Sequence, residues 1–342
     1  MKKSFNEIRE YICSKKNLGS NFKPEWVVIV LNFNGLKDLK YSLKSILKTK
    51  SKLKFKILVV DNNSSDNSFN YLKRNYSKNN KVELLFLKKN YGWSKANNIA
   101  MKYMIMKYSP KYFTLANNDI IVHPDWLKSC HKVFDYDKKI GICGCTVYGD
   151  GEFVPYKEYL QAKKKYKKFN LVITNKHIGG MLFNIRSETI RLLAFIDEGF
   201  FFYGEEIDLQ KRASKIGVKK AIVNTPIWHN TSSTHKRYKF RASLHQMIAE
   251  LRLTLKHRSF FAFLKKFSSI FYNIIFFKKL KKLSKRYSGA KRLIPSDYKI
   301  INIMILLLAI IKVILNYPNL KRRIFYENNC IKKYDKIIQE RK

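Results

Sequence analysis

The chain has 342 residues, of which 69 are Lys or Arg and 25 are Asp or Glu, giving a formal net charge of +44. Hydrophobic residues make up 46% of it and aromatic residues 14%, which is too much apolar material for a disordered polycation. This composition excludes fibrous and low-complexity proteins and predicts one large globular domain or two smaller ones.

The cysteines and the N-terminus indicate where the protein resides. Five cysteines form no Cys-x-x-Cys pair, which predicts free thiols in a reducing compartment. The N-terminus is basic and contains no run of seven apolar residues. We therefore expect no secretory signal there and a cytoplasmic location.

Short apolar runs alternate with helical patterns between residues 26 and 116. The run Trp26–Leu31 predicts a strand, and the apolar residues from Leu36 to Leu47 then recur at helical spacing. Strands of five or six residues separated by helices predict an α/β fold with a mostly parallel central sheet. The further expected elements are strands over 55–60, 82–87 and 112–116 and a helix over 93–107.

Polar residues follow the predicted end of each strand. Ligands of such sheets bind beyond the carboxyl ends of the strands, so these loops are the expected binding site. Loops rich in Asn, Asp, Ser and Gly are also ordinary turn sequences, and both interpretations stay open. The sequence supports neither a dinucleotide fold of the usual kind nor a P-loop, since it has no GxGxxG and no GxxxxGK[ST]. The four polar loops begin at Asn32, Asp61, Asn90 and Asn117.

Five of the 25 acidic residues fall within twelve positions, around an aromatic run over 200–203. Carboxylates beside apolar neighbours tend to have a raised pKa, the condition under which one can act as a general base. The first turn of a helix is the alternative explanation, because acidic residues are favoured there and a helical pattern follows. The five residues are Asp197, Glu198, Glu205, Glu206 and Asp208.

The C-terminal third is the most basic part of the chain. Residues 236–342 hold 27 Lys or Arg and five acids, and between Glu250 and Asp297 aromatic residues alternate with basic pairs without any acid. Basic, aromatic helices suit an anionic membrane interface. The apolar stretch Ile300–Leu315 is shorter than the roughly 20 residues of a spanning helix. It is open whether this stretch lies on or re-enters a membrane, spans it, or is buried against the protein.

Taken in order, these segments resemble the family 2 glycosyltransferases of the GT-A fold, especially the rhamnosyltransferase-like members. The resemblance runs from about Trp26 to His235. It implies a GT-A catalytic domain over 26–235. A basic N-terminal extension over 1–25 and the basic, aromatic-rich helical region over 236–342, which we expect from its composition to associate with a membrane, flank this domain. The segments that carry it are VVIVLNFNG, LVVDNNSSDNS, NYGWSKANNIAM, FTLANNDIIVHPDWL, GGMLFNIRSETI, FIDEGFFFYGEEIDLQKRASKIG and IWHNTSSTH.

The resemblance assigns the nucleotide-sugar donor to the strand-end loops. Asp61 corresponds to the aspartate that hydrogen-bonds the nucleobase in this family, and Asn32 lies in the first nucleotide-contacting loop. Asn90, Gly92 and Asn97 match the segment that closes over the nucleotide and its ribose. We expect these five residues to bind the donor.

The resemblance also implies a metal site. Asn117, Asn118 and Asp119 stand where the family has a D-x-D motif, whose last aspartate holds a divalent metal that bridges the donor diphosphate. Because Asn117 replaces the first aspartate, Asp119 alone can supply a charged ligand. His229 resembles a histidine that completes the metal site in several relatives, and it favours Mn²⁺ over Mg²⁺. Gly180 corresponds to the floor of the sugar site, where a small residue lets the backbone approach the donor.

Glu205 and Glu206 stand where the family has a Glu-Asp pair. Glu206 is the candidate base for an inverting displacement by an acceptor hydroxyl, although the choice between the two stays open. Asp208 and Arg212 match positions that orient the helix. The resemblance implies transfer of a hexose or deoxyhexose to a lipid-linked glycan in surface polysaccharide or glycoconjugate synthesis, at the inner face of the cell membrane.

Other functions fit parts of the sequence. A soluble or protein acceptor is the alternative within the enzyme class, and Asn117 and Glu206 would also fit a non-catalytic scaffold. The charge of +44 would suit a nucleic-acid-binding protein. The sequence has no nucleic-acid-binding motif, however, and the acids over 197–208 would repel phosphate. We therefore expect a glycan acceptor and an anionic membrane surface as partners, with no specific nucleic acid.

Overall fold

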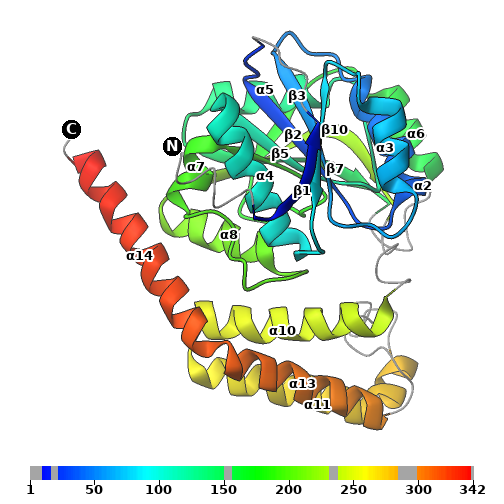
Figure 1. Cartoon of the computed structure of the whole chain (residues 1–342). Coiled ribbons are helices and arrows are strands. Elements are labelled where there is room, and N and C mark those ends of the chain that lie inside the picture. Colours follow the sequence, from blue (N-terminus) through cyan, green and yellow to red (C-terminus); the bar gives the residue numbers. More distant parts are fainter. Residues whose placement is uncertain (1–9, 17–21, 150–155, 231–237, 284–298, 340–342) are drawn as a thin grey trace. The chain divides into compact units, whose positions relative to one another are not determined.

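The computed structural model describes residues 10–16, 22–149, 156–230, 238–283 and 299–339 (Figure 1). The chain divides into two compact units. The first comprises Met1–Ile196 and Arg212–Thr231, and the second comprises Asp197–Lys211 and Ser232–Lys342. The acidic segment therefore groups with the C-terminal helices, while the expected domain boundary after residue 235 stays a prediction.

The first unit is built on a ten-stranded mixed sheet with the order β1-β4-β3-β2-β5-β9-β7-β10-β6, in which β8 also pairs with β10. Its bounds are β1 Ile12–Lys16, β2 Trp26–Asn32, β3 Phe55–Asp61, β4 Val82–Leu87, β5 Tyr112–Asn117, β6 Ile120–Val122, β7 Ile140–Tyr148, β8 Leu171–Ile173, β9 Leu182–Arg186 and β10 Lys219–His229. The neighbours β4, β3, β2 and β5 run parallel. β9 then enters antiparallel to both β5 and β7.

The four strands predicted from apolar runs are confirmed to within one residue, as is the helix predicted over 93–107. Every residue of β2, β3 and β4 is buried. Parallel strands covered by helices on both faces need apolar side chains at successive positions, which explains why these strands read as continuous runs.

Helices cover the sheet on both sides (Figure 1). α2 (Leu36–Leu47), α3 (Ser68–Tyr76) and α5 (Trp126–Tyr136) share one apolar core with alternate residues of β2. α4 (Gly92–Tyr108) packs against β2 and β3. The unit also contains α6 (Tyr156–Lys165) and α7 (Ser187–Leu192).

The cysteines are free thiols wherever their side chains are described. Cys130, Cys143 and Cys145 are buried in the first unit, and Cys330 is partly exposed. The side chain of Cys13 lies outside the described residues. The prediction of free thiols is therefore confirmed for four of the five cysteines.

The second unit is helical. It contains the start of α8 (Glu205–Lys215), followed by α10 (Lys239–His257), α11 (Phe260–Leu283), α13 (Lys299–Leu315) and α14 (Tyr317–Gln339). α10, α11 and α13 share an apolar core. Within the described part of the chain no single helix has the length and apolarity to cross a membrane; Lys299–Leu315 and Tyr317–Lys332, bent by 54°, would meet that test only as a pair.

Candidate functional site

The parallel register brings the predicted loop residues of the first unit to one edge of the sheet. Asn32 at the end of β2 lies opposite Asp61 at the end of β3. On the other side of β2, Leu31 lies opposite Asn117 at the end of β5. Residues separated by as many as 85 positions in sequence therefore share this edge because their strands end at the same level.

A hydrogen-bonded network joins three of the predicted residues. The side-chain amide of Asn32 donates to Asp61 Oδ2 at 2.9 Å, and the amide of Asn118 donates to Asn32 Oδ1 at 2.6 Å. The backbone N–H of Ser64 donates to the other carboxylate oxygen of Asp61 at 2.8 Å. Asn32 and Asp61 are 0% and 3% exposed. The carboxylate of Asp61 is thus held in one orientation, while each oxygen keeps a lone pair for a further donor.

Gly35, which follows the first polar loop, is required by this network. A Cβ atom at Gly35 would lie 2.0 Å from Nδ2 of Asn118 and 3.2 Å from Oδ1 of Asn32. Any larger residue would displace the Asn118 amide from its bond to Asn32. Gly35 lies in a segment that carries the family resemblance, but the sequence alone does not predict its contact with Asn118.

A second network fixes the loop before α4. Asn62 Nδ2 donates to Asn90 Oδ1 at 2.9 Å, and Asn62 Oδ1 accepts the backbone N–H of Tyr91 at 2.9 Å. Asn90 Oδ1 also accepts the N–H of Gly92 at 2.9 Å. Gly92 has a φ of +76°, which glycine adopts without strain. Asn62 thus links Asn90 and Gly92 to the strand-end site. It was not among the site residues expected from the sequence.

Asn97 lies further along α4 and is 1% exposed. Its side-chain amide donates to the backbone oxygen of Trp93 at 2.9 Å, within its own helix. The structure does not join Asn97 to either network through a described hydrogen bond. Its expected contact with the nucleotide stays a prediction.

The three residues of the Asn117-Asn118-Asp119 motif have three different partners. Asn117 Oδ1 accepts the indole N–H of Trp93 at 3.1 Å, and Asn118 bonds to Asn32 as described. Asp119 Oδ1 lies 3.2 Å from His229 Nε2. The two asparagines therefore shape the loop, and Asp119 carries the negative charge.

The strand topology explains the pairing of Asp119 with His229. Asp119 lies in the turn between β5 and β6, and β6 pairs antiparallel with β10, so that Ile120 faces His229. The backbone N–H of Asn230 also donates to the carbonyl oxygen of Asp119 at 2.8 Å. Both side chains are largely buried, with 9% of Asp119 and 11% of His229 exposed. The remainder of the last motif, residues 231–235, lies outside the described residues.

This pair fits a divalent cation. One carboxylate oxygen and one imidazole nitrogen converge at a separation from which both can reach the same ion. Oxygen suits Mg²⁺ and Mn²⁺, whereas imidazole is a common ligand of transition metals, so the mixed donor set favours Mn²⁺. Gly180 lies close by, because the next residue, Met181, accepts the backbone N–H of Asn117 at 3.0 Å.

The candidate base lies in the second unit, at the start of α8. Glu205 and Glu206 form the first turn of this helix, after Gly204 with a φ of +83°. Glu205 is 6% exposed, and burial, followed by the charge of Glu206, holds its pKa well above the usual range. Glu206 is partly exposed. The raised pKa expected for a carboxylate of this segment is confirmed for Glu205, and the expected helix start is confirmed as well.

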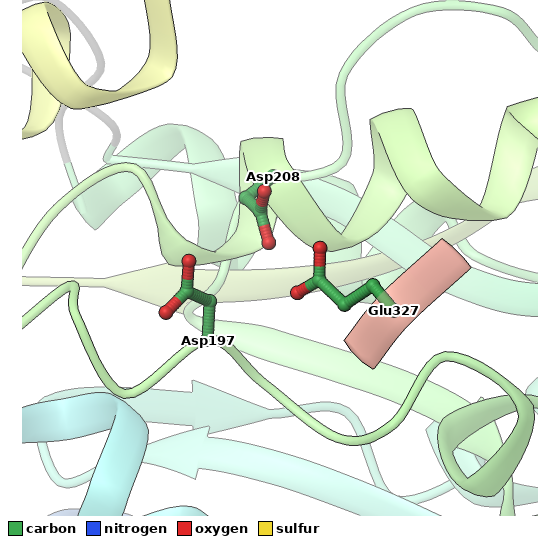
Figure 2. A group of neighbouring side chains, drawn as sticks. All are labelled: Asp197, Asp208 and Glu327. Carbon is green, nitrogen blue, oxygen red and sulfur yellow. The ribbon is translucent and has the colours of Figure 1, made fainter. Parts of the chain in front are cut away.

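Asp197, Asp208 and Glu327 bring three buried carboxylates together from the loop before α8, from α8 and from α14 (Figure 2). Their facing oxygens lie within 4.8 Å of one another, a spacing that could hold a metal ion. The ammonium group of Lys256 on α10 already serves all three, at 2.8 Å from Asp197, 2.8 Å from Asp208 and 2.9 Å from Glu327. An ammonium has three N–H donors, one for each carboxylate. We therefore interpret the group as a lysine-centred ion cluster rather than a metal site.

Two arginines and a histidine complete this cluster. Arg252 contacts both oxygens of Asp197 at 2.9 and 3.0 Å, His257 lies 2.8 Å from Asp208, and Arg323 lies 2.6 Å from Glu327. Burial alone would raise the pKa of Asp197, but Lys256 and Arg252 lower it below the usual value.

The two helix-orienting residues predicted on α8 are both anchored. Asp208 is fully buried in the ion cluster of the second unit. Arg212, in the first unit, donates to the backbone oxygens of Leu193 and Phe195.

The chain is similar in sequence to known glycosyltransferases. Residues 27–197, half of the chain, match the family described as "Glycosyl transferase family 2". A segment of 119 residues, 34% of the chain, is 31% identical to the bifunctional glycosyltransferase pgtA of Dictyostelium discoideum, and the alignment spans 15% of that longer protein.

The solved structure of mannosyltransferase PcManGT from Pyrobaculum calidifontis, in complex with GDP-Man and Mn²⁺, is similar over 91% of this chain and 92% of its own, with 13% identity and a TM-score of 0.53. This likeness concerns the fold. The α/β GT-A fold with a mostly parallel central sheet, expected from the sequence, is confirmed, and the C-terminal helices are present.

Proposed function

Because the chain belongs to glycosyl transferase family 2, we propose that it moves a sugar from a nucleotide-diphosphate sugar to a hydroxyl group of a glycan acceptor. The observation that carries this proposal is the strand-end site itself. A fixed, buried carboxylate at Asp61 and a carboxylate–imidazole pair at Asp119 and His229 occur in the same unit, at loops of the same sheet. Those groups suit the two ends of a nucleoside diphosphate, a base with N–H donors and a diphosphate held through a cation.

In this proposal the strand-end loops bind the donor. Asp61 accepts a hydrogen bond from the nucleobase, and Asn32 and Ser64 keep its carboxylate oriented. Asn90 and Gly92, fixed by Asn62, contact the nucleotide. Positioning by residues that are already hydrogen-bonded lowers the entropic cost of binding.

Asp119 and His229 would hold a divalent metal, with Mn²⁺ favoured by the imidazole ligand. The relative PcManGT was solved with Mn²⁺ and GDP-Man, which supports the same pairing of metal and donor here. When bound, such a metal neutralises charge on the departing nucleoside diphosphate. Gly180 precedes Met181, whose carbonyl accepts the backbone N–H of Asn117, and we propose that its lack of a side chain lets the backbone approach the sugar.

Glu206 is the proposed base. A general base must be ionised at the working pH and must be able to meet the acceptor hydroxyl. Glu205 is buried, with 6% of its surface exposed, whereas Glu206 is partly exposed and can be reached by the acceptor. We infer that Glu206 takes the acceptor proton and that the displacement inverts the anomeric centre. The acceptor we propose is a lipid-linked glycan in surface polysaccharide or glycoconjugate synthesis.

The test begins with a screen of UDP-, GDP- and dTDP-sugars for thermal stabilisation of the full chain, with and without Mn²⁺, because a ligand that binds the folded state raises its melting temperature. Release of nucleoside diphosphate from the stabilising donor is then measured for wild type, Glu206→Gln and the control Glu198→Gln, which changes an exposed acid of the same segment.

We expect Glu206→Gln to keep the donor-induced stabilisation and to lower the release rate by about 10²–10⁴-fold, the usual contribution of a general base. Glu198→Gln should behave as wild type. Wild-type turnover by Glu206→Gln would move the base elsewhere. A wild-type chain that neither binds nor cleaves any of these donors would contradict the proposed function.

A further inference from the structure

α13 exposes an apolar face. Its residues at positions i, i+4, i+7, i+8, i+11 and i+14 are large, apolar and 47–74% exposed, whereas the opposite side of the helix packs into the core shared with α10 and α11. The spacing places the exposed residues on one side of a helix. We call this set the α13 face; it consists of Ile300, Met304, Leu307, Leu308, Ile311 and Ile314.

The neighbouring helix extends this exposure. α11 packs beside α13, and six of its apolar or aromatic residues are 41–82% exposed. An exposed apolar surface of this size on a folded protein marks an interaction site. The six residues of α11 are Phe260, Phe261, Leu264, Phe271, Tyr272 and Phe276.

The charge of the same helices is entirely positive. Neither Phe260–Leu283 nor Lys299–Leu315 contains an acidic residue. Exposed cations accompany the apolar side chains at Lys265 on α11, at Lys312 on α13 and at Lys321 on α14. Residues 236–342 as a whole carry 27 basic and five acidic residues.

We propose that the α13 face, together with the exposed residues of α11, binds the surface of an anionic lipid bilayer, with the apolar side chains inserted at the headgroup boundary and the lysines on lipid phosphates. The charge complementarity favours this occupant, because anionic lipids attract basic segments. A second copy of the chain would bring a like charge against each of these cations. Aromatic and apolar residues at a basic surface are also the composition of interfacial helices.

The dimensions favour a helix that lies on the bilayer. The 17 residues of α13 extend about 26 Å at about 1.5 Å per residue, which is less than the hydrocarbon core of roughly 30 Å. Its buried side is also taken up by the core of its own unit, in which Leu306, Ala309 and Val313 contact residues of α10 and α11. A helix that packs on one side and is apolar on the other can bury that second side in the interface without crossing the membrane.

The experiment measures sedimentation of the full chain with preformed phosphatidylcholine vesicles that contain either no phosphatidylglycerol or 30% of it. The variant is Leu307→Gln/Ile311→Gln/Ile314→Gln, which changes three residues of the α13 face without adding charge. The matched control is Tyr136→Gln/Val172→Gln/Ile173→Gln, three residues of the first unit that are 45–70% exposed. Far-UV circular dichroism and melting temperatures establish that both variants are folded.

We expect wild type and control to bind the anionic vesicles at least tenfold more strongly than the neutral ones, to lose binding as salt is raised, and to dissociate on dilution. The α13 variant should have a partition coefficient at least tenfold lower on anionic vesicles. Equal binding by the variant and the control would overturn the proposal, as would equal binding to neutral and anionic vesicles. Dimerisation by wild type in analytical ultracentrifugation, lost in the variant and without vesicle binding, would identify a second copy as the occupant instead. The assay requires no sugar transfer, so its outcome is independent of the proposed function.

Discussion

Replacing Lys256 by Met removes the ammonium group at the centre of the ion cluster while keeping a side chain of similar length. Asp197, Asp208 and Glu327 would then face one another with exposed fractions of 2%, 0% and 4%. Asp197 and Glu327 would keep their contacts with Arg252 and Arg323, and Asp208 would keep its contact with the His257 imidazole. The expected result is a large, pH-dependent loss of stability.

The loss of stability in Lys256→Met can be calculated from the structure in two ways. Two carboxylates whose facing oxygens lie within 4.8 Å of each other repel by at least about 3.5 kcal/mol at an effective dielectric constant of about 20. The variant can relieve this repulsion by binding a proton, which at pH 7 costs about 4 kcal/mol for a carboxyl with an ordinary pKa near 3.9. Both routes predict a loss of about 3–4 kcal/mol at pH 7, in the range seen when one partner of a buried ion pair is removed.

The pH dependence follows from the same proton. The cost of protonation falls by about 1.4 kcal/mol per pH unit, so the variant should be only about 1.5 kcal/mol less stable than wild type at pH 5. The pKa of Asp197 is lowered in the wild type, so the stabilisation from that residue persists above its unfolded pKa and is lost only as the pH falls through the folded value. Wild type therefore keeps the stabilisation from Asp197 at pH 5.

Urea unfolding followed by circular dichroism at pH 7 and pH 5 measures these differences. The control is Lys266→Met, which breaks an ion pair with Glu250 at 2.7 Å in the same unit, between side chains 35% and 36% exposed. Surface pairs of this kind contribute less than about 1 kcal/mol. A loss in Lys256→Met no greater than in Lys266→Met, or one that does not shrink at pH 5, would refute the reasoning.

Two further predictions concern the strand-end site. Gly35→Ala should displace the Asn118 amide from Asn32, and the loss of one hydrogen bond of about 1 kcal/mol should raise the dissociation constants of UDP or GDP in calorimetry about fivefold. Gly217→Ala, at a glycine with a φ of +71° and no neighbour within 4 Å, is the control, and equal effects of the two would argue against the Asn118 contact. Asp119→Asn should abolish the additional thermal stabilisation that Mn²⁺ gives in the presence of the nucleotide sugar, because it removes the charged oxygen ligand. Unchanged stabilisation by Mn²⁺ in that variant would place the metal elsewhere.

Much of the fold could be read from the sequence because burial leaves a local signature. The parallel strands are covered on both sides, so their residues are apolar at successive positions and their ends are marked by polar loops. The position of β9 in the sheet has no comparable signature in the sequence. Its five residues enter the sheet antiparallel between β5 and β7, a position fixed by pairing across the sheet.

Part of the candidate site could likewise be predicted from the sequence, and part could not. Asn32, Asp61, Asn90 and Asp119 could be selected because each follows a predicted strand, and the structure places them at loops of one sheet. The side-chain partners of these residues could not be predicted, because they depend on strand register and on short contacts such as that between Gly35 and Asn118. The ion cluster could not be predicted either, because Lys256 is 59 residues from Asp197 and 71 from Glu327 in sequence. The residues next to Lys256 in sequence also do not distinguish it from the many other lysines of the chain.

The Lys256 cluster has a consequence for how the protein responds to chelators. An ammonium group holds three carboxylates at a spacing that would suit a metal ion, but it is covalently attached to α10 and cannot be extracted. If Asp119 and His229 hold the divalent cation proposed for them, EDTA would remove it and leave the packing of the second unit unchanged. Strong acid, in contrast, would destabilise the second unit, because it would protonate the carboxylates that the lysine binds. Removal of the proposed metal and loss of helical structure are therefore expected to be separable events in this chain.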